Sequence, residues 1–104
     1  MTETQLVRSI LDGLKFRRIF AWRANSGAVT AEYKGKKRFI RFAGIEGLSD
    51  IIGILPDGRF LAIECKVGKN KATELQLQFL SAVNQSGGVA FIARSWDDVE
   101  RSIG

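Results

Sequence analysis

Apolar residues recur with a helical period near both ends of the chain. The first stripe predicts a helix over residues 2–14, and it consists of Val7, Ile10, Leu11 and Leu14. Thr2 and Gln5 have the spacing of a capping box at its start. A second helix is predicted over residues 73–85, ended by a Ser-Gly-Gly segment. A short third helix is predicted after Ser95, with Trp96, Val99 and Ile103 on its apolar side.

Apolar runs bounded by turn signals predict the strands. They indicate a strand at Arg18–Trp22, a hairpin in residues 28–42 that turns at 34–36, a second hairpin in residues 47–66, and a strand at Val89–Arg94. The predicted order is helix, five strands, helix, strand, helix. Such an order favours an α/β (α+β) fold with a mixed central sheet flanked by helices, formed by one domain over residues 1–104.

The second hairpin contains the most apolar strands of the chain, and its loop decides which side chains face each other. The segment "LPDGR" suits a three-residue loop in which Gly58 takes the left-handed position. Asp50 then lies directly opposite Glu64, with Cβ atoms about 4.5–5.5 Å apart, and Lys66 follows on the same face. A two-residue loop would instead place Asp50 opposite Cys65.

Carboxylates are costly at this place, because both faces of the hairpin are otherwise apolar and are expected to be covered. Lys66 can neutralise one of them. A hard divalent ion such as Mg²⁺ would satisfy both, with the backbone carbonyl of Cys65 as a third oxygen ligand. The alternative is a salt bridge between Glu64 and Lys66 that meets solvent at the end of the strand.

Composition and charge restrict the catalytic mechanisms and the binding partners that the chain can have. The 104 residues are 45% hydrophobic, carry a net charge of +5 and include no histidine. The basic balance fits a polyanionic partner such as nucleic acid, and the lack of histidine excludes Ser-His and Cys-His catalysis. No apolar run is long enough to span a membrane, and the polar N-terminus is unlike a signal peptide. With a single cysteine, Cys65, the chain is expected to be cytoplasmic.

Taken together, these motifs resemble a known nuclease family. The segments "GLSDIIGILPDGRFLAIECK" and "TELQLQFLSAVNQSGGVAFIAR", with the upstream "RANSGA", are similar to the VRR-NUC (virus-type replication-repair nuclease) family. Its pattern is a Ser/Pro-Asp pair, a Glu-x-Lys strand and a Gln early in the next helix. The resemblance covers nearly the whole chain and implies a PD-(D/E)XK restriction-endonuclease-like core. Ser49 stands where the wider superfamily often has Pro.

The resemblance implies Mg²⁺-dependent hydrolysis of DNA phosphodiester bonds, with Mn²⁺ expected to substitute. Asp50, Glu64 and the Cys65 carbonyl would hold the metal, and Lys66 would orient the attacking water. Two further residues have competing interpretations. Glu3 is either an added metal ligand or a favourable acid in the first turn of a helix. Gln76 is either a catalytic residue or part of a capping box with Thr73.

The same resemblance assigns nucleic-acid contacts to Arg23 and Asn25. Lys34, Lys36, Lys37 and Arg38 form either a solvated hairpin tip or, together with Lys69 and Lys71, contacts to phosphates. We expect Trp22, Trp96 and the Cys65 side chain to lie in the core. Stand-alone family members resemble Holliday-junction (four-way junction) resolvases that act as homodimers, and symmetric cutting needs two sites where one chain offers one.

Two other classes of function remain open from the sequence. The chain could be a non-catalytic nucleic-acid-binding module on a nuclease-like fold. It could also be a basic scaffold protein in which the acids are structural. Both leave the pair of opposed acids in the hairpin unexplained.

Overall fold

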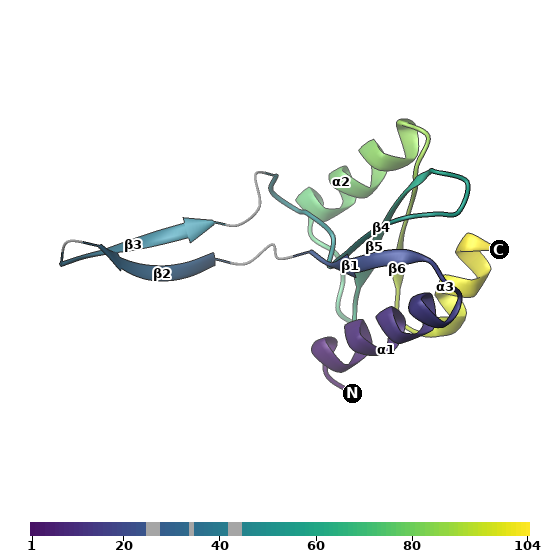
Figure 1. Ribbon diagram of the computed structural model, residues 1–104, viewed down its shortest axis with the longest axis horizontal. Coiled ribbons are helices and arrows are strands. Elements are labelled where there is room, and N and C mark those ends of the chain that lie inside the picture. Colours follow the sequence, from purple (N-terminus) through teal and green to yellow (C-terminus); the bar gives the residue numbers. More distant parts are fainter. Residues whose placement is uncertain (25–27, 34, 42–44) are drawn as a thin grey trace.

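A four-stranded mixed sheet flanked by three helices forms the body of the protein in the computed structural model, which describes residues 1–24, 28–33, 35–41 and 45–104 (Figure 1). In spatial order the sheet strands are β1 (Phe20–Arg23), β4 (Ile51–Ile54), β5 (Phe60–Cys65) and β6 (Val89–Ala93). Only β5 and β6 are parallel to each other. The helices are α1 (Glu3–Phe16), α2 (Glu74–Gln85) and α3 (Trp96–Ile103). The predicted element order and mixed architecture are therefore confirmed.

A separate hairpin stands apart from this body (Figure 1). Strands β2 (Ala28–Tyr33) and β3 (Lys36–Arg41) pair antiparallel, with Tyr33 opposite Lys36. The predicted hairpin is confirmed, although Lys36 already belongs to the second strand. Lys34 lies outside the described residues.

The β4–β5 loop has the three-residue form that the sequence predicted. Leu55 N–H donates to the Arg59 carbonyl at 2.9 Å, and Gly58 N–H donates to the Leu55 carbonyl at 2.8 Å. Gly58 has φ +91°, the left-handed conformation that favours glycine. Ile54 pairs with Phe60 and Ile51 with Ile63, so the next pair outward is Asp50 and Glu64. The predicted register is confirmed.

The helices begin where their caps predict. The side chains of Thr2 and Gln5 form a capping box on α1, those of Thr73 and Gln76 form one on α2, and Ser95 is the N-cap of α3. Some boundaries differ, because α1 continues to Phe16, β1 spans Phe20–Arg23 rather than Arg18–Trp22, and β6 ends at Ala93 rather than Arg94. Arg18 ends the helix in a left-handed conformation with φ 60°. The helix end has no glycine, so the usual stop signal is missing from the sequence.

Helices cover both faces of the two central strands. On one face, α1 lies against β1 and β5 and α3 lies against β6, and they share a core that includes Ile10, Leu14, Ile51, Ile63, Cys65 and Val99. On the other face, α2 packs on β5 and β6 through Ile52, Ala62, Leu80, Val83 and Ala90. The buried hairpin is thus confirmed, and the Cys65 and Trp96 side chains belong to or pack against the first core, as predicted.

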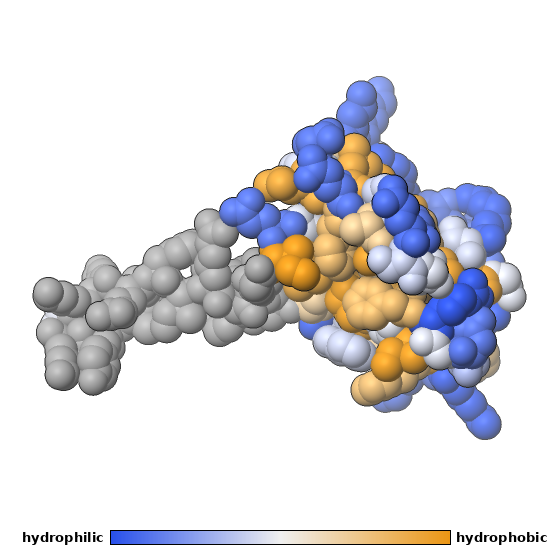
Figure 2. All heavy atoms as spheres, turned by 90° about the horizontal axis from the view of Figure 1, so that it is seen from above, coloured by the Kyte–Doolittle hydropathy of each residue, from blue (hydrophilic) through white to orange (hydrophobic). Residues whose placement is uncertain are grey.

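Coverage of the second face is incomplete near β1. Trp22 is 43% exposed, so the expectation that it lies in the core is wrong. Phe20, Ile54 and Phe60 lie side by side on the same face and are also exposed, because α2 covers β6 and the part of the sheet around Ile52 and Ala62 but does not reach them. Figure 2 shows apolar side chains reaching the surface among polar ones. Within the described residues, no helix has the length and apolar character needed to cross a membrane.

The segment that leads into β4 passes close to the start of α2. Gly47 has φ +78°, and a Cβ atom there would lie 2.3 Å from the Leu75 carbonyl oxygen. Gly58 also has a positive φ but has open space around it. We therefore expect Gly47→Ala to destabilise the fold by about 3 kcal/mol, from left-handed strain plus overpacking. Gly58→Ala should cost only about 1 kcal/mol, from strain alone.

Urea unfolding of both variants measures this difference. Equal losses of free energy of unfolding would show that the close approach of Gly47 to α2 adds nothing to the stability of the fold.

Candidate functional site

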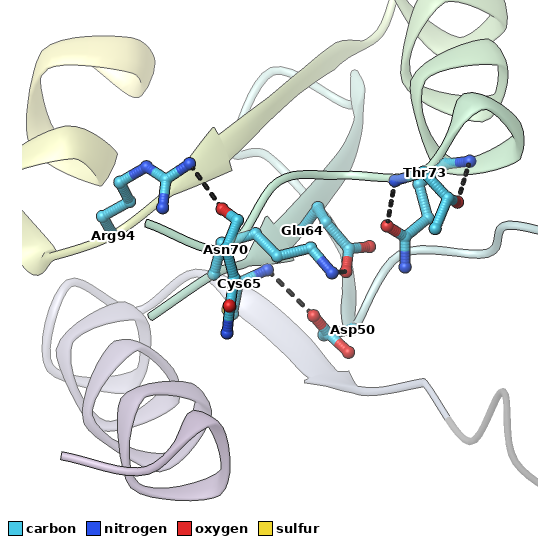
Figure 3. A network of polar contacts seen from close by, with 8 residues as sticks. Asp50, Glu64, Cys65, Asn70, Thr73 and Arg94 are labelled. Atoms are coloured by element: carbon cyan, nitrogen blue, oxygen red, sulfur yellow. Dashed lines mark hydrogen bonds and ion pairs between the residues drawn. The ribbon is translucent and has the colours of Figure 1, made fainter. Parts of the chain in front are cut away.

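Asp50, Glu64 and Lys66 meet where β4 begins and β5 ends. Figure 3 shows Asp50 and Glu64 in close-up. Glu64 is only 1% exposed, and the Lys66 ammonium lies 3.5 Å from its Oε1 atom. The Lys66 side chain is itself only 12% exposed. The pair is therefore largely withdrawn from solvent, which corrects the alternative of a solvated salt bridge at the strand end.

Asp50 is held in place from two sides. Its Oδ2 atom accepts the Cys65 N–H at 2.9 Å, and its carbonyl accepts the Ala24 N–H at 2.8 Å. The side chain thus satisfies a backbone donor of β5 just beyond the β4–β5 ladder, which ends at Ile51. These bonds fix the carboxylate of Asp50 beside that of Glu64.

Among the described residues, the Oε2 atom of Glu64 is buried without a hydrogen-bond partner, and so is the Oγ atom of Ser49, the residue before Asp50. An unpartnered buried acceptor is costly, and natural folds leave few of them. Carboxylate oxygens are the ligands that Mg²⁺ prefers, and this ion commonly uses one or two carboxylates while keeping water molecules. The donor set at Asp50 and Glu64 therefore fits a hard divalent cation.

The pKa of Glu64 is raised to about 8. Burial of the carboxyl group is the largest cause, followed by hydrogen bonding with Asp50 and the negative charge of Asp50, while Lys66 acts in the opposite direction. Without a cation, Glu64 is therefore mainly protonated at neutral pH.

The Cys65 thiol points into the core on the opposite face of the sheet. Burial, together with the charges of Asp50 and Glu64, raises its pKa to about 12. A thiol that stays protonated is a poor nucleophile. The side chain is thus a packing group, and only the backbone carbonyl of Cys65 remains as a candidate ligand.

Glu3 belongs to the helix on the other side of the sheet from the two opposed carboxylates, Asp50 and Glu64. It is exposed in the first turn of α1, which covers the Cys65 face of the sheet, whereas Asp50 and Glu64 share the α2 face with Ile52 and Ala62. Its charge still raises the pKa of Cys65. Across the described ranges, no three His, Cys, Asp or Glu side chains lie close enough together to hold a metal by themselves. The ligand role of Glu3 stays a prediction.

Gln76 has a structural role that the geometry accounts for. Its Oε1 atom accepts the Thr73 N–H at 2.8 Å, and the Thr73 hydroxyl accepts the Gln76 N–H at 3.2 Å. The residue is half-buried in the first turn of α2, the helix on the face of the sheet that carries the carboxylates. The capping interpretation is thus confirmed, and the catalytic one stays a prediction.

The predicted nucleic-acid contacts lie on segments that border the site. Arg23 is exposed at the end of β1, paired with Ile51 beside Asp50. Lys69 and Lys71 are exposed in the loop between β5 and α2. Asn25 lies outside the described residues.

The sequence interpretation missed Arg94, which directly follows β6. Its two terminal nitrogens donate to the Gly68 carbonyl at 2.7 Å and to the Asn70 carbonyl at 2.8 Å. The available signal was a basic residue at the carboxyl end of the strand predicted at Val89–Arg94. A single sequence does not show which loop such a residue reaches.

The pKa of Glu64 predicts how stability depends on pH in metal-free protein. Folded Glu64 keeps its proton up to about pH 8, whereas the unfolded residue releases it near the ordinary value of 4.5. The folded state therefore binds more protons within this window, and the free energy of unfolding falls as pH rises through it. At about 1.4 kcal/mol per pKa unit, the loss across this window is on the order of 5 kcal/mol.

Urea unfolding in EDTA at several pH values between about 5 and 8 measures this loss. Glu64→Gln should remove most of the fall, because the amide is neutral throughout. Asp12→Asn, which changes an exposed carboxylate in α1, should keep it. A wild-type protein whose stability stays level across the window would contradict the raised pKa.

No protein-family model matches this sequence, and a search of curated proteins finds no significant match.

Proposed function

We propose that this protein is a Mg²⁺-dependent DNA endonuclease with a PD-(D/E)XK core, as its resemblance to VRR-NUC nucleases implies. The observation that carries the proposal is the buried carboxyl group of Glu64, which faces Asp50 and Lys66 and leaves one oxygen without a donor among the described residues. A fold stabilised only by packing would be better served by apolar side chains at these positions. A bound cation would compensate this cost.

In this proposal Asp50, Glu64 and the Cys65 carbonyl hold the ion. When bound, the ion supplies Lewis-acid stabilisation of the phosphate and a more acidic water molecule. Glu64 would hold the ion in its carboxylate form, so its proton would be released to solvent. Mn²⁺ should occupy the same oxygen ligands.

Lys66 is the residue proposed to act on the water and the phosphate. Its ammonium is largely buried and lies beside Glu64, so its charge is weakly screened by solvent. From there it can orient the attacking water and offset negative charge on the phosphate. Gln76 would hold that water through its side-chain amide nitrogen, because its oxygen is engaged in the cap. Glu3 would contribute at most through water.

The DNA backbone would approach over Arg23, Asn25, Lys69 and Lys71. Contacts to phosphates are independent of sequence and depend on salt, which suits an enzyme that selects a DNA structure. The net charge of +5 favours the same partner. A cytoplasmic location would give the protein access to DNA.

A homodimer is part of the proposal for four-way junctions, because symmetric cutting needs two copies of the site. The open part of the α2 face offers an apolar surface for it, where Phe20 is 68% exposed and its ring lies 5.2 Å from that of Trp22. Large exposed apolar side chains gathered on one face are typical of protein interfaces.

Metal binding is tested separately from catalysis. We expect Mg²⁺ at about one hundred times its dissociation constant to raise the free energy of unfolding by about 2.7 kcal/mol. Asp50→Asn should lose most of this gain, and Asp12→Asn should keep it. Thermal unfolding with and without Mg²⁺ measures both. A gain that is identical in wild type and Asp50→Asn would place the ion elsewhere.

Cleavage is tested with a labelled four-way junction beside linear duplex and single-stranded DNA. We expect paired cuts in the junction with Mg²⁺ or Mn²⁺, and no cuts in EDTA. Asp50→Ala and Lys66→Met should each lower the rate at least about a hundredfold, because each removes a group that stabilises the transition state. Asp12→Asn should cut normally.

The other outcomes separate the alternatives. Cutting of linear DNA as well would keep the nuclease and remove the preference for junctions. Binding of DNA without a cut, across several divalent metals, would replace the enzyme by a nucleic-acid-binding module.

A further inference from the structure

Arg94 ties the loop between β5 and α2 to the end of β6. One terminal nitrogen of its guanidinium donates to the Gly68 carbonyl at 2.7 Å, and the other donates to the Asn70 carbonyl at 2.8 Å, the contact drawn in Figure 3. These carbonyls flank Lys69 on either side. An arginine fork with two acceptors fixes both position and orientation, which a single hydrogen bond does not.

The backbone of Arg94 is itself anchored on the start of α3. Its N–H donates to Asp98 Oδ2 at 2.8 Å, and Asp98 Oδ1 is paired with Arg101. Val99, the residue after Asp98, is fully buried in the core. The backbone that carries the Arg94 guanidinium is therefore fixed to α3, which packs into the core.

The loop it holds begins at the candidate site. Lys66 N–H donates to the carbonyl of Ala93, the residue before Arg94, at 3.1 Å. Lys69 follows Lys66 by three residues, so their Cα atoms lie at most about 11 Å apart. Within the loop, Gly68 has φ 60° and Asn70 N–H donates to the Val67 carbonyl at 3.2 Å. Val67 also packs against the first core, so the start of the loop is held by packing, and its tip at Gly68 and Asn70 is held by Arg94.

We propose that Arg94 is a positioning residue that fixes residues 67–71, so that Lys69 and Lys71 bind DNA phosphates beside the Asp50–Glu64 pair. The inference rests on the proposed function. A flexible loop would have to be ordered when DNA binds, at a cost in affinity, and a loop already held by Arg94 avoids that cost. The two terminal nitrogens of Arg94 are engaged by carbonyls, which favours support of the loop over direct phosphate contact.

The test compares Arg94→Lys with Arg59→Lys. Lysine keeps the charge but cannot form the fork. Arg59 is an exposed arginine at the opposite end of β5, where it pairs with Asp57, so it controls for the substitution itself. Amide hydrogen exchange reports on the loop without DNA. In Arg94→Lys we expect the Asn70 amide to exchange about tenfold faster, while amides in the centre of β5 are unchanged.

DNA affinity is then measured in EDTA, so that no strand is cut. Arg94→Lys should bind about tenfold more weakly than wild type, and Arg59→Lys should bind normally. Double substitution of Lys69 and Lys71 by Ala should remove most of the effect of Arg94→Lys, since the two changes act through the same contacts.

Each opposite result overturns the inference in a different way. Unchanged exchange at Asn70 in Arg94→Lys would show that Arg94 does not fix the loop. Faster exchange with unchanged DNA affinity would show that the loop does not bind DNA. A wild-type protein that binds no DNA would overturn the proposed function itself, and this inference with it.

Discussion

The three-residue turn at residues 56–58 determines which side chains of the two central strands meet. With Gly58 in the left-handed position, Ile54 pairs with Phe60, and the pairs that follow bring Asp50 opposite Glu64. A turn shorter by one residue would move every side chain of β5 to the other face relative to β4, so the carboxylates would part and the apolar residues would lose their partners. The packing of the core and the geometry of the site therefore depend on the same loop.

The fold buries the end of β5, and this burial is unfavourable for the charged form of Glu64. Ile63 and Cys65 are fully buried on one face, and Glu64 between them is almost as deeply buried on the other. Lys66 partly compensates Glu64, yet the raised pKa shows that the balance in the metal-free protein favours the protonated acid. The fold tolerates the buried acid because the apolar core stabilises the surrounding strands and helices by more than the burial of Glu64 costs.

Local signals in the sequence were sufficient for the elements and the register, whereas features set by distant contacts were not predictable. The caps at Thr2, Thr73 and Ser95 begin helices because a side-chain oxygen meets backbone N–H groups only a few residues away. Trp22 was misjudged because its exposure depends on how far α2 extends across the sheet. The hydrogen bonds from Arg94 to the carbonyls of residues 68 and 70 were missed because they join positions more than twenty residues apart. Of the candidate site, the placement of Asp50, Glu64 and Lys66 followed from strand pairing alone, while that of Glu3 depends on which face α1 covers.

The buried thiol of Cys65 has a practical consequence. It is the single cysteine of the chain, it is inaccessible, and it belongs to the strand that carries Glu64. Only the thiolate reacts readily with alkylating reagents, so the folded protein is protected both by burial and by the raised pKa. Labelling therefore requires β5 to separate from α1 and α3. The rate at which an alkylating reagent modifies Cys65 therefore reports how often the central sheet opens. Mass spectrometry measures this rate without any engineered probe.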